Sequence, residues 1–184
     1  WKQAVEQRYL PLVRFFGDKT LQKGLPKLKE KIYKLANSTH KTRYDFFVKI
    51  KPPASLISEL RQVNFSGLRL TKVPDWILNL PKLISLKLGK NKIRQVPESL
   101  GKLDKLLMLD LWGNQLRRLP DSLAQLQNLD YLRLDANRFK EIPPVIMQLA
   151  ALQYLNLDSN PITQLPLNLG NLHQLDILTI RETK

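Results

Sequence analysis

A leucine recurs every 23 residues through most of this chain, and this interval constrains the fold more than any other feature of the sequence. The recurring residues are Leu60, Leu83, Leu106, Leu129, Leu152 and Leu175. The same apolar template follows each leucine without an insertion, so the chain holds five full repeats and a truncated sixth that ends at Lys184. One repeat is too small to bury an apolar face alone, so successive repeats must stack and share one core.

Within each repeat, positions 4 and 6 are apolar and alternate with more polar residues, as Leu86 and Leu88 do. This alternation predicts a short strand with one face turned inward, and successive strands then form a parallel sheet. An asparagine recurs at position 9, where the chain leaves the strand, although the first repeat has Leu68 there. Its amide can donate to and accept from buried backbone groups of neighbouring turns. We therefore expect a structural asparagine ladder of Asn91, Asn114, Asn137 and Asn160.

A Leu-Pro, Val-Pro or Ile-Pro pair follows in each repeat, as in Leu119-Pro120. Proline suits the start of a short helix because the first helical N–H has no acceptor within the helix. The apolar residues that follow at intervals of three, such as Leu123 and Leu126, would hold this segment on the core. The pattern predicts short helical or 3-10 segments on the side away from the strands.

The template LxxLxLxxNxLxxLPxxLxxLxx resembles the leucine-rich repeat, in the 23-residue form of intracellular and bacterial repeat proteins. The resemblance covers roughly residues 60–184. It implies an α/β fold: a right-handed solenoid with a parallel sheet on its concave face and short helical or 3-10 segments on its convex face. It also implies a module that recognises a protein or peptide through the concave face.

Residues 1–55 do not repeat, and their charge differs from that of residues 56–184. They carry 13 Lys+Arg and 4 Asp+Glu, against 17 and 12 in the remainder. The turn-forming segment KPPAS at 51–55 marks the boundary. We expect a basic, mainly helical N-terminal cap over the end of the solenoid core. The alternatives are a separate functional domain and the remnant of a longer partner domain.

Positions 3, 5 and 7 alternate with the buried strand positions, so their side chains should line the concave surface. Three large aromatic residues gather there on the later repeats. Aromatic residues with a charged rim are typical of binding hot spots. The predicted partner site comprises Met108, Asp110, Trp112, Tyr131, Arg133, Asp135, Tyr154, Asn156 and Asp158. The alternative is that these rings only shield neighbouring strands by cross-strand packing.

The composition argues against other kinds of site. The absence of cysteine excludes disulfides, thiolate zinc sites and a cysteine nucleophile, and it favours a cytoplasmic location. Only two histidines are present, and no phosphate-binding loop, G-x-S-x-G, H-E-x-x-H or dinucleotide motif occurs. We expect no enzyme activity, catalytic residue, metal or cofactor. No apolar stretch approaches the roughly 20 residues of a membrane span.

The net charge of +14 leaves other partners open. Electrostatic binding of nucleic acid or an anionic membrane would most naturally use residues 1–55. On the solenoid, three aspartates lie among the aromatic residues, where stacked bases would need cations, so nucleic acid is not the expected partner. A further alternative is that the chain is the recognition segment of a larger signalling protein or bacterial effector. In isolation we expect a monomer.

Overall fold

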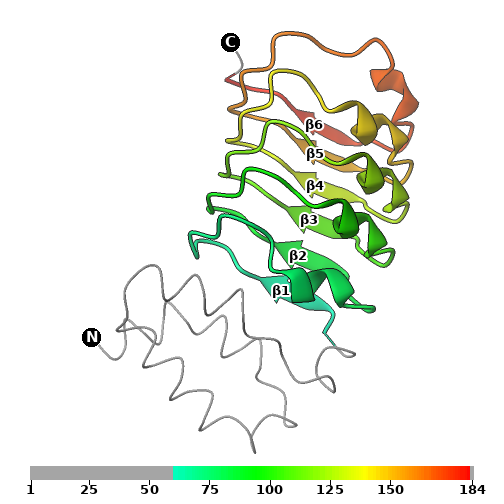
Figure 1. Ribbon diagram of the computed structural model, residues 1–184. Helices are drawn as coiled ribbons and strands as arrows, with labels where there is room; N and C mark the ends of the chain where they lie inside the picture. Colours follow the sequence, from blue (N-terminus) through cyan, green and yellow to red (C-terminus); the bar gives the residue numbers. More distant parts are fainter. Residues whose placement is uncertain (1–59, 183–184) are drawn as a thin grey trace, which may run out of the picture. The chain divides into compact units, whose positions relative to one another are not determined.

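The computed structural model describes residues 60–182, and these residues form a stack of similar coils (Figure 1). Each full coil contributes one short strand to a sheet and one short 3-10 segment to another side of the stack, and the truncated last coil contributes a strand alone within the described residues. The predictions for residues 1–55, including the helical cap, lie outside the described residues.

The strands form a parallel sheet in chain order, β1 to β6, which confirms the predicted architecture. Residues at the same position of successive repeats pair with each other, as Leu86 does with Leu109 and Leu109 with Leu132. This constant register follows from a repeat length that never changes. The strands are β1 (Gln62–Asn64), β2 (Ser85–Lys87), β3 (Met108–Asp110), β4 (Tyr131–Arg133), β5 (Tyr154–Asn156) and β6 (Ile177–Thr179).

The helical segments are 3-10 turns that begin one residue after the prolines in most coils. Pro120, for example, lies just before its segment, and its carbonyl accepts the N–H of Leu123 at 3.1 Å. Proline therefore supplies the first acceptor of the turn, although we expected it to occupy the first helical position. The segments are η2 (Asp75–Asn79), η3 (Glu98–Lys102), η4 (Asp121–Gln125), η5 (Pro144–Gln148) and η6 (Leu169–Asn171).

One apolar core runs the length of the stack. The inward strand residues Leu86, Leu109, Leu132 and Leu155 are fully buried, as are the leucines two positions after each of them. Leu123 of η4 closes the same core from the side of the 3-10 segments. Burial of this kind contributes about 1.5–3 kcal/mol per leucine, so the repeated leucines supply most of the driving force for stacking.

The asparagines at position 9 bridge successive coils. The Asn114 side chain accepts the N–H of Ile93 at 3.0 Å and donates to the carbonyl oxygens of Leu88 and Leu111 at 3.0 and 2.9 Å. Asn91, Asn137 and Asn160 make the equivalent hydrogen bonds. Each amide thus serves its own coil and the preceding one. The first coil has the half-buried Leu68 at this position.

The residue before each asparagine position turns the chain out of the strand through a left-handed conformation. Its φ is +62° at Gly113, +53° at Lys90 and Ala136, and +54° at Ser159. Glycine adopts this conformation freely, whereas other L-residues are strained by it. The turn thus recurs in every described coil whether or not glycine is present.

Candidate partner-binding site

The outward side chains of β3 to β6 form an apolar column across the sheet: Met108, Tyr131, Tyr154 and Ile177. Tyr131 and Tyr154 stack face to face, with ring centroids 4.3 Å apart and planes 2° from parallel. Both rings are half-buried. Burial and the neighbouring Tyr154 raise the pKa of Tyr131, so the Tyr131 hydroxyl stays protonated at neutral pH. The column therefore combines apolar ring surface with the two tyrosine hydroxyls.

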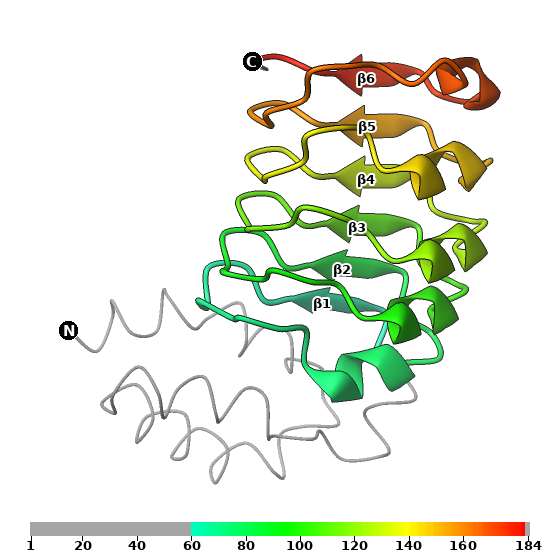
Figure 2. The same ribbon diagram turned by 45° about the horizontal axis from the view of Figure 1, so that its top comes forward.

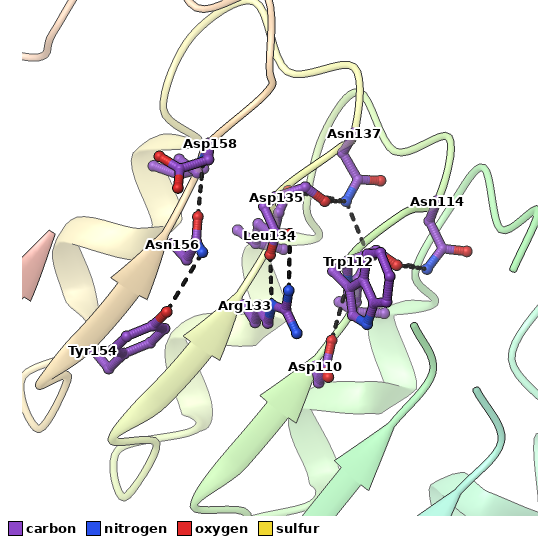
Figure 3. A network of polar contacts seen from close by, with 12 residues as sticks. Asp110, Trp112, Asn114, Arg133, Leu134, Asp135, Asn137, Tyr154, Asn156 and Asp158 are labelled. Carbon is purple, nitrogen blue, oxygen red and sulfur yellow. Dashed lines mark hydrogen bonds and ion pairs between the residues drawn. The ribbon is translucent and has the colours of Figure 1, made fainter. Parts of the chain in front are cut away.

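Trp112 lies two residues after the end of β3, where its ring fits over the preceding coil (Figure 3). A Cβ atom on Gly89 would collide with the indole, so glycine at that position makes room for it. The Lys90 ammonium and the Arg133 guanidinium each lie 4.8 Å from the ring centroid. Such cation–π contacts are worth about 0.5–1 kcal/mol at exposed sites. The tryptophan is thus half-buried and held by groups from both neighbouring coils.

Arg133 forms a two-pronged ion pair with Asp135 on the same coil (Figure 3). Its Nε and Nη2 donate to the two carboxylate oxygens at 2.7 and 3.1 Å. Partial burial lowers the pKa of Arg133, but the hydrogen bond to Asp135 and the charges of Asp135 and Asp110 outweigh this effect and raise it. The two hydrogen bonds therefore fix the direction of the guanidinium beside Trp112.

Asp110 is placed differently from the charged rim that we expected. It is only 8% exposed, and its Oδ1 accepts the N–H of Trp112 at 3.1 Å. Asn156 makes the same contact with the N–H of Asp158 at 2.9 Å. Burial raises the pKa of Asp110 in spite of the Trp112 N–H and the nearby Arg133, which lower it. Asp110 thus shapes the turn after β3 and has little surface to offer a partner.

The far end of the site is polar. The Asn156 amide lies 3.4 Å from the Tyr154 hydroxyl, and Asp158 accepts the N–H of Arg181 at 2.6 Å. Asn156 and Asp158 are both half-buried. The structure thus brings all nine predicted site residues onto adjoining coils, while Trp112, Arg133 and Asp135 form one cluster and the tyrosines form another.

Sequence reasoning missed the contribution of Gly89 and Lys90. Gly89 and Trp112 both occupy position 7, in successive coils. A glycine in the coil before a tryptophan at the same outward position is the signal that could have predicted how the indole packs. The contact of Lys90 with Trp112 could not be predicted in this way, because Lys90 lies in a left-handed turn and the alternation of a strand does not set the direction of its side chain.

Within residues 60–182, no three His, Asp or Glu side chains come close enough together to hold a metal ion. In the same range, no helix has the length and apolar character needed to cross a lipid bilayer.

Two family models match the repeats of this chain. A model of a leucine-rich repeat region matches residues 79–153, and a second leucine rich repeat model matches residues 127–184. No sequence relative among curated proteins matches the chain.

Solved structures with the same fold come from several organisms. A leucine-rich repeat protein of Leptospira interrogans is 34% identical with a TM-score of 0.67, covering 70% of this chain and 33% of that one. The plant peptide hormone receptor RGFR1, in complex with RGF2, is 32% identical with a TM-score of 0.52, covering 60% of this chain and 18% of that one. An internalin of Listeria monocytogenes is 26% identical with a TM-score of 0.60, covering 74% of this chain and 38% of that one. The chain thus spans well under half the length of each of these proteins.

Proposed function

Because the chain belongs to the leucine-rich repeat family, we propose that it is a non-catalytic recognition module that binds a protein or peptide through the concave face of its sheet. The observation that carries the proposal is the pair of aromatic clusters on that face, Trp112 with Arg133 and Asp135, and Tyr131 with Tyr154. The likeness to a plant peptide hormone receptor in complex with RGF2 supports the same kind of partner.

The packing of these clusters favours binding over simple shielding of the strands. Three large rings that are already stacked or seated lose little conformational freedom when a partner covers them, which lowers the cost of association. Their half-exposed edges and the Tyr131 and Tyr154 hydroxyls still leave apolar and polar area to bury. The fixed Arg133 guanidinium adds direction, because charge complementarity sets the register of a partner.

Peptides selected on the wild-type chain from a random displayed library test the proposal. Their affinity is then measured for Trp112→Ala and Tyr131→Ala, with Leu167→Ala as the matched control, since Leu167 is an apolar side chain fully exposed outside the sheet. We expect each concave-face variant to lose about ten-fold or more in affinity, as for hot-spot residues, and the control to bind as the wild type does. Selected peptides that bind all three variants equally well would show that the concave face is not the site.

Two further parts of the proposal concern the protein in the cell. The lack of cysteine fits a cytoplasmic location, which fractionation of the native cells would test. We expect a monomer, so the mass measured by light scattering should be that of one chain at every concentration. Recovery in the medium or envelope, or a concentration-dependent mass, would contradict these expectations.

A further inference from the structure

The loops that follow the strands, along the left edge of Figure 2, carry a second surface apart from the concave face. Outward side chains occur there at positions 10, 12 and 13, because positions 9, 11 and 14 of these coils point into the core. In the second to fourth repeats the outward positions hold mostly arginine and lysine. We call this surface the basic flank, and it consists of Lys92, Arg94, Arg117, Arg118, Arg138 and Lys140.

The charges of the basic flank are available to a partner. All six side chains are exposed. None of them forms an ion pair within the part of the chain that the structure describes, where Lys105 pairs with Asp104 and Arg133 with Asp135. Glu141 is the one carboxylate at these positions in the three repeats. Six cations without ion pairs on one surface repel each other in the free protein. The basic flank therefore attracts an anion.

The backbone beneath the basic flank is rigid. Hydrogen bonds join successive coils there, from the Gln115 N–H to the Ile93 carbonyl at 2.9 Å and from the Arg138 N–H to the Leu116 carbonyl at 2.8 Å. The Arg94 guanidinium also donates to the Gln115 side chain of the next coil at 3.3 Å. Residues on neighbouring coils are therefore held at about the 4.8 Å spacing of paired strands. The backbone positions that carry the cations therefore form ordered rows.

An acidic row limits the width of the basic flank. Asp75, Glu98 and Asp121 are exposed at the start of successive 3-10 segments. A pocket of about 440 Å³ shows how close the two rows come, because Arg118 lines it together with Glu98 and Asp121. A nucleic-acid duplex or a membrane surface is broad enough to bring phosphates over these carboxylates as well. A single extended chain can follow the cations and avoid them.

From this geometry we infer that the basic flank binds an extended acidic segment of a partner protein, laid across the second to fourth repeats. Same-face side chains of an extended segment recur about every 6.8 Å, so two carboxylates fit along the roughly 10 Å between the second and fourth coils. The flank carries no aromatic side chain at positions 10, 12 or 13, so it offers no platform on which single-stranded bases could stack.

Fluorescence anisotropy with a labelled oligoglutamate peptide tests this inference on the full chain. The variant Arg94→Gln/Arg117→Gln/Lys140→Gln removes three charges from the basic flank. The matched control Lys27→Gln/Lys31→Gln/Lys34→Gln removes three charges from residues 1–55. We expect the flank variant to bind about ten-fold more weakly, and the control variant and Trp112→Ala to bind as the wild type does. Binding should also weaken as salt rises.

Two results would overturn the inference. If the flank variant binds as the wild type does, or loses no more than the control variant, the peptide responds only to net charge or to residues 1–55. If a short DNA duplex or phosphatidylserine vesicles bind more tightly than the peptide, and lose that binding in the flank variant, the partner is not an acidic protein segment. Because Trp112→Ala tests the concave face separately, failure here leaves the proposed function standing.

Discussion

At the scale of single residues, the structure separates side chains that shape the coils from those that face outward. The asparagines at position 9 are almost fully buried, and each one satisfies backbone groups of two coils. Removing such a side chain leaves several buried groups without a partner, which costs far more than losing an exposed hydrogen bond.

The replacement Asn114→Ala should therefore lower the free energy of unfolding by about 2–4 kcal/mol. Its matched control is Asn128→Ala, because the exposed Asn128 amide makes one hydrogen bond, to the Asp104 carbonyl at 2.8 Å. The control should cost less than about 1 kcal/mol. Urea denaturation compares the two, and equal losses would contradict the structural role of the ladder.

The left-handed turn provides a matched pair of its own. Gly113→Ala should cost about 1–2 kcal/mol of stability through backbone strain, because a Cβ there meets only ordinary contacts with Lys90. Ala136→Gly, at the same position of the next coil, should instead gain about 1 kcal/mol, since relief of strain exceeds the added freedom of the unfolded chain. Thermal or urea unfolding measures both, and a loss of stability in Ala136→Gly would contradict the argument.

Asp110 should make stability depend on pH. Its pKa is raised in the folded state, so the folded chain binds a proton more tightly than the unfolded chain does. The ionised carboxylate therefore lowers stability above the folded-state pKa. This loss disappears as the pH falls through that pKa toward the ordinary aspartate value of 3.8. Asp110→Asn cannot ionise, and its amide oxygen can still accept the Trp112 N–H, as Asn156 accepts that of Asp158.

We accordingly expect Asp110→Asn to unfold at a higher urea concentration than the wild type at neutral pH, and the two midpoints to converge in mild acid. Asp135→Asn serves as the comparison, because it breaks the ion pair with Arg133 and should destabilise the chain at neutral pH. A midpoint difference between Asp110→Asn and wild type that stays constant with pH would show that burial of the carboxylate has no net cost.

At the scale of the elements, the sequence predicted the strands and the 3-10 segments well, because both depend on local spacing. Val63 and Leu86 pair in register because each repeat has the same length. Contacts between elements depend on residues a whole repeat apart. Gly101 of η3 is an example, since a Cβ on it would collide with the backbone carbonyl of Ser122 in η4.

Gly101→Ala should therefore destabilise the chain by about 1–3 kcal/mol, as overpacking against backbone does. Gly170 occupies the equivalent position three coils later, where a Cβ would meet no atom within 4 Å. Gly170→Ala should leave stability unchanged or raise it by up to about 1 kcal/mol, because alanine restricts the unfolded chain. Urea denaturation of the pair decides, and similar effects at both positions would refute close packing between η3 and η4.

At the scale of the whole molecule, stability is a sum over stacked coils. The loss of stability caused by a core substitution therefore depends on its position along the stack. Leu132 in β4 is fully buried between two coils, whereas Leu178 in β6 is partly exposed because no described coil covers it. The concave face and the basic flank are separate surfaces of the same stack, so the two proposed sites can be tested independently.

Leu132→Ala should cost about 3–4 kcal/mol of stability, the range for a buried leucine. The same change at Leu178 should cost about 1 kcal/mol, because less apolar area leaves the core. Both leucines occupy position 4 of their repeats, so the two substitutions differ only in their place along the stack. Urea denaturation measures the free energy of unfolding that each one loses. Equal costs would mean that stability does not vary along the stack.

The sequence by itself determined the repeat length, the inward leucines, the asparagine at the turn and hence the parallel solenoid, because these follow from local periodicity and the need to share a core. Only the tertiary structure decided which outward residues are free. Asp110 is buried, Trp112 is seated over Gly89, and Arg133 is held by Asp135. These outcomes depend on side-chain volumes and charges on neighbouring coils a few ångströms away, which periodicity does not encode.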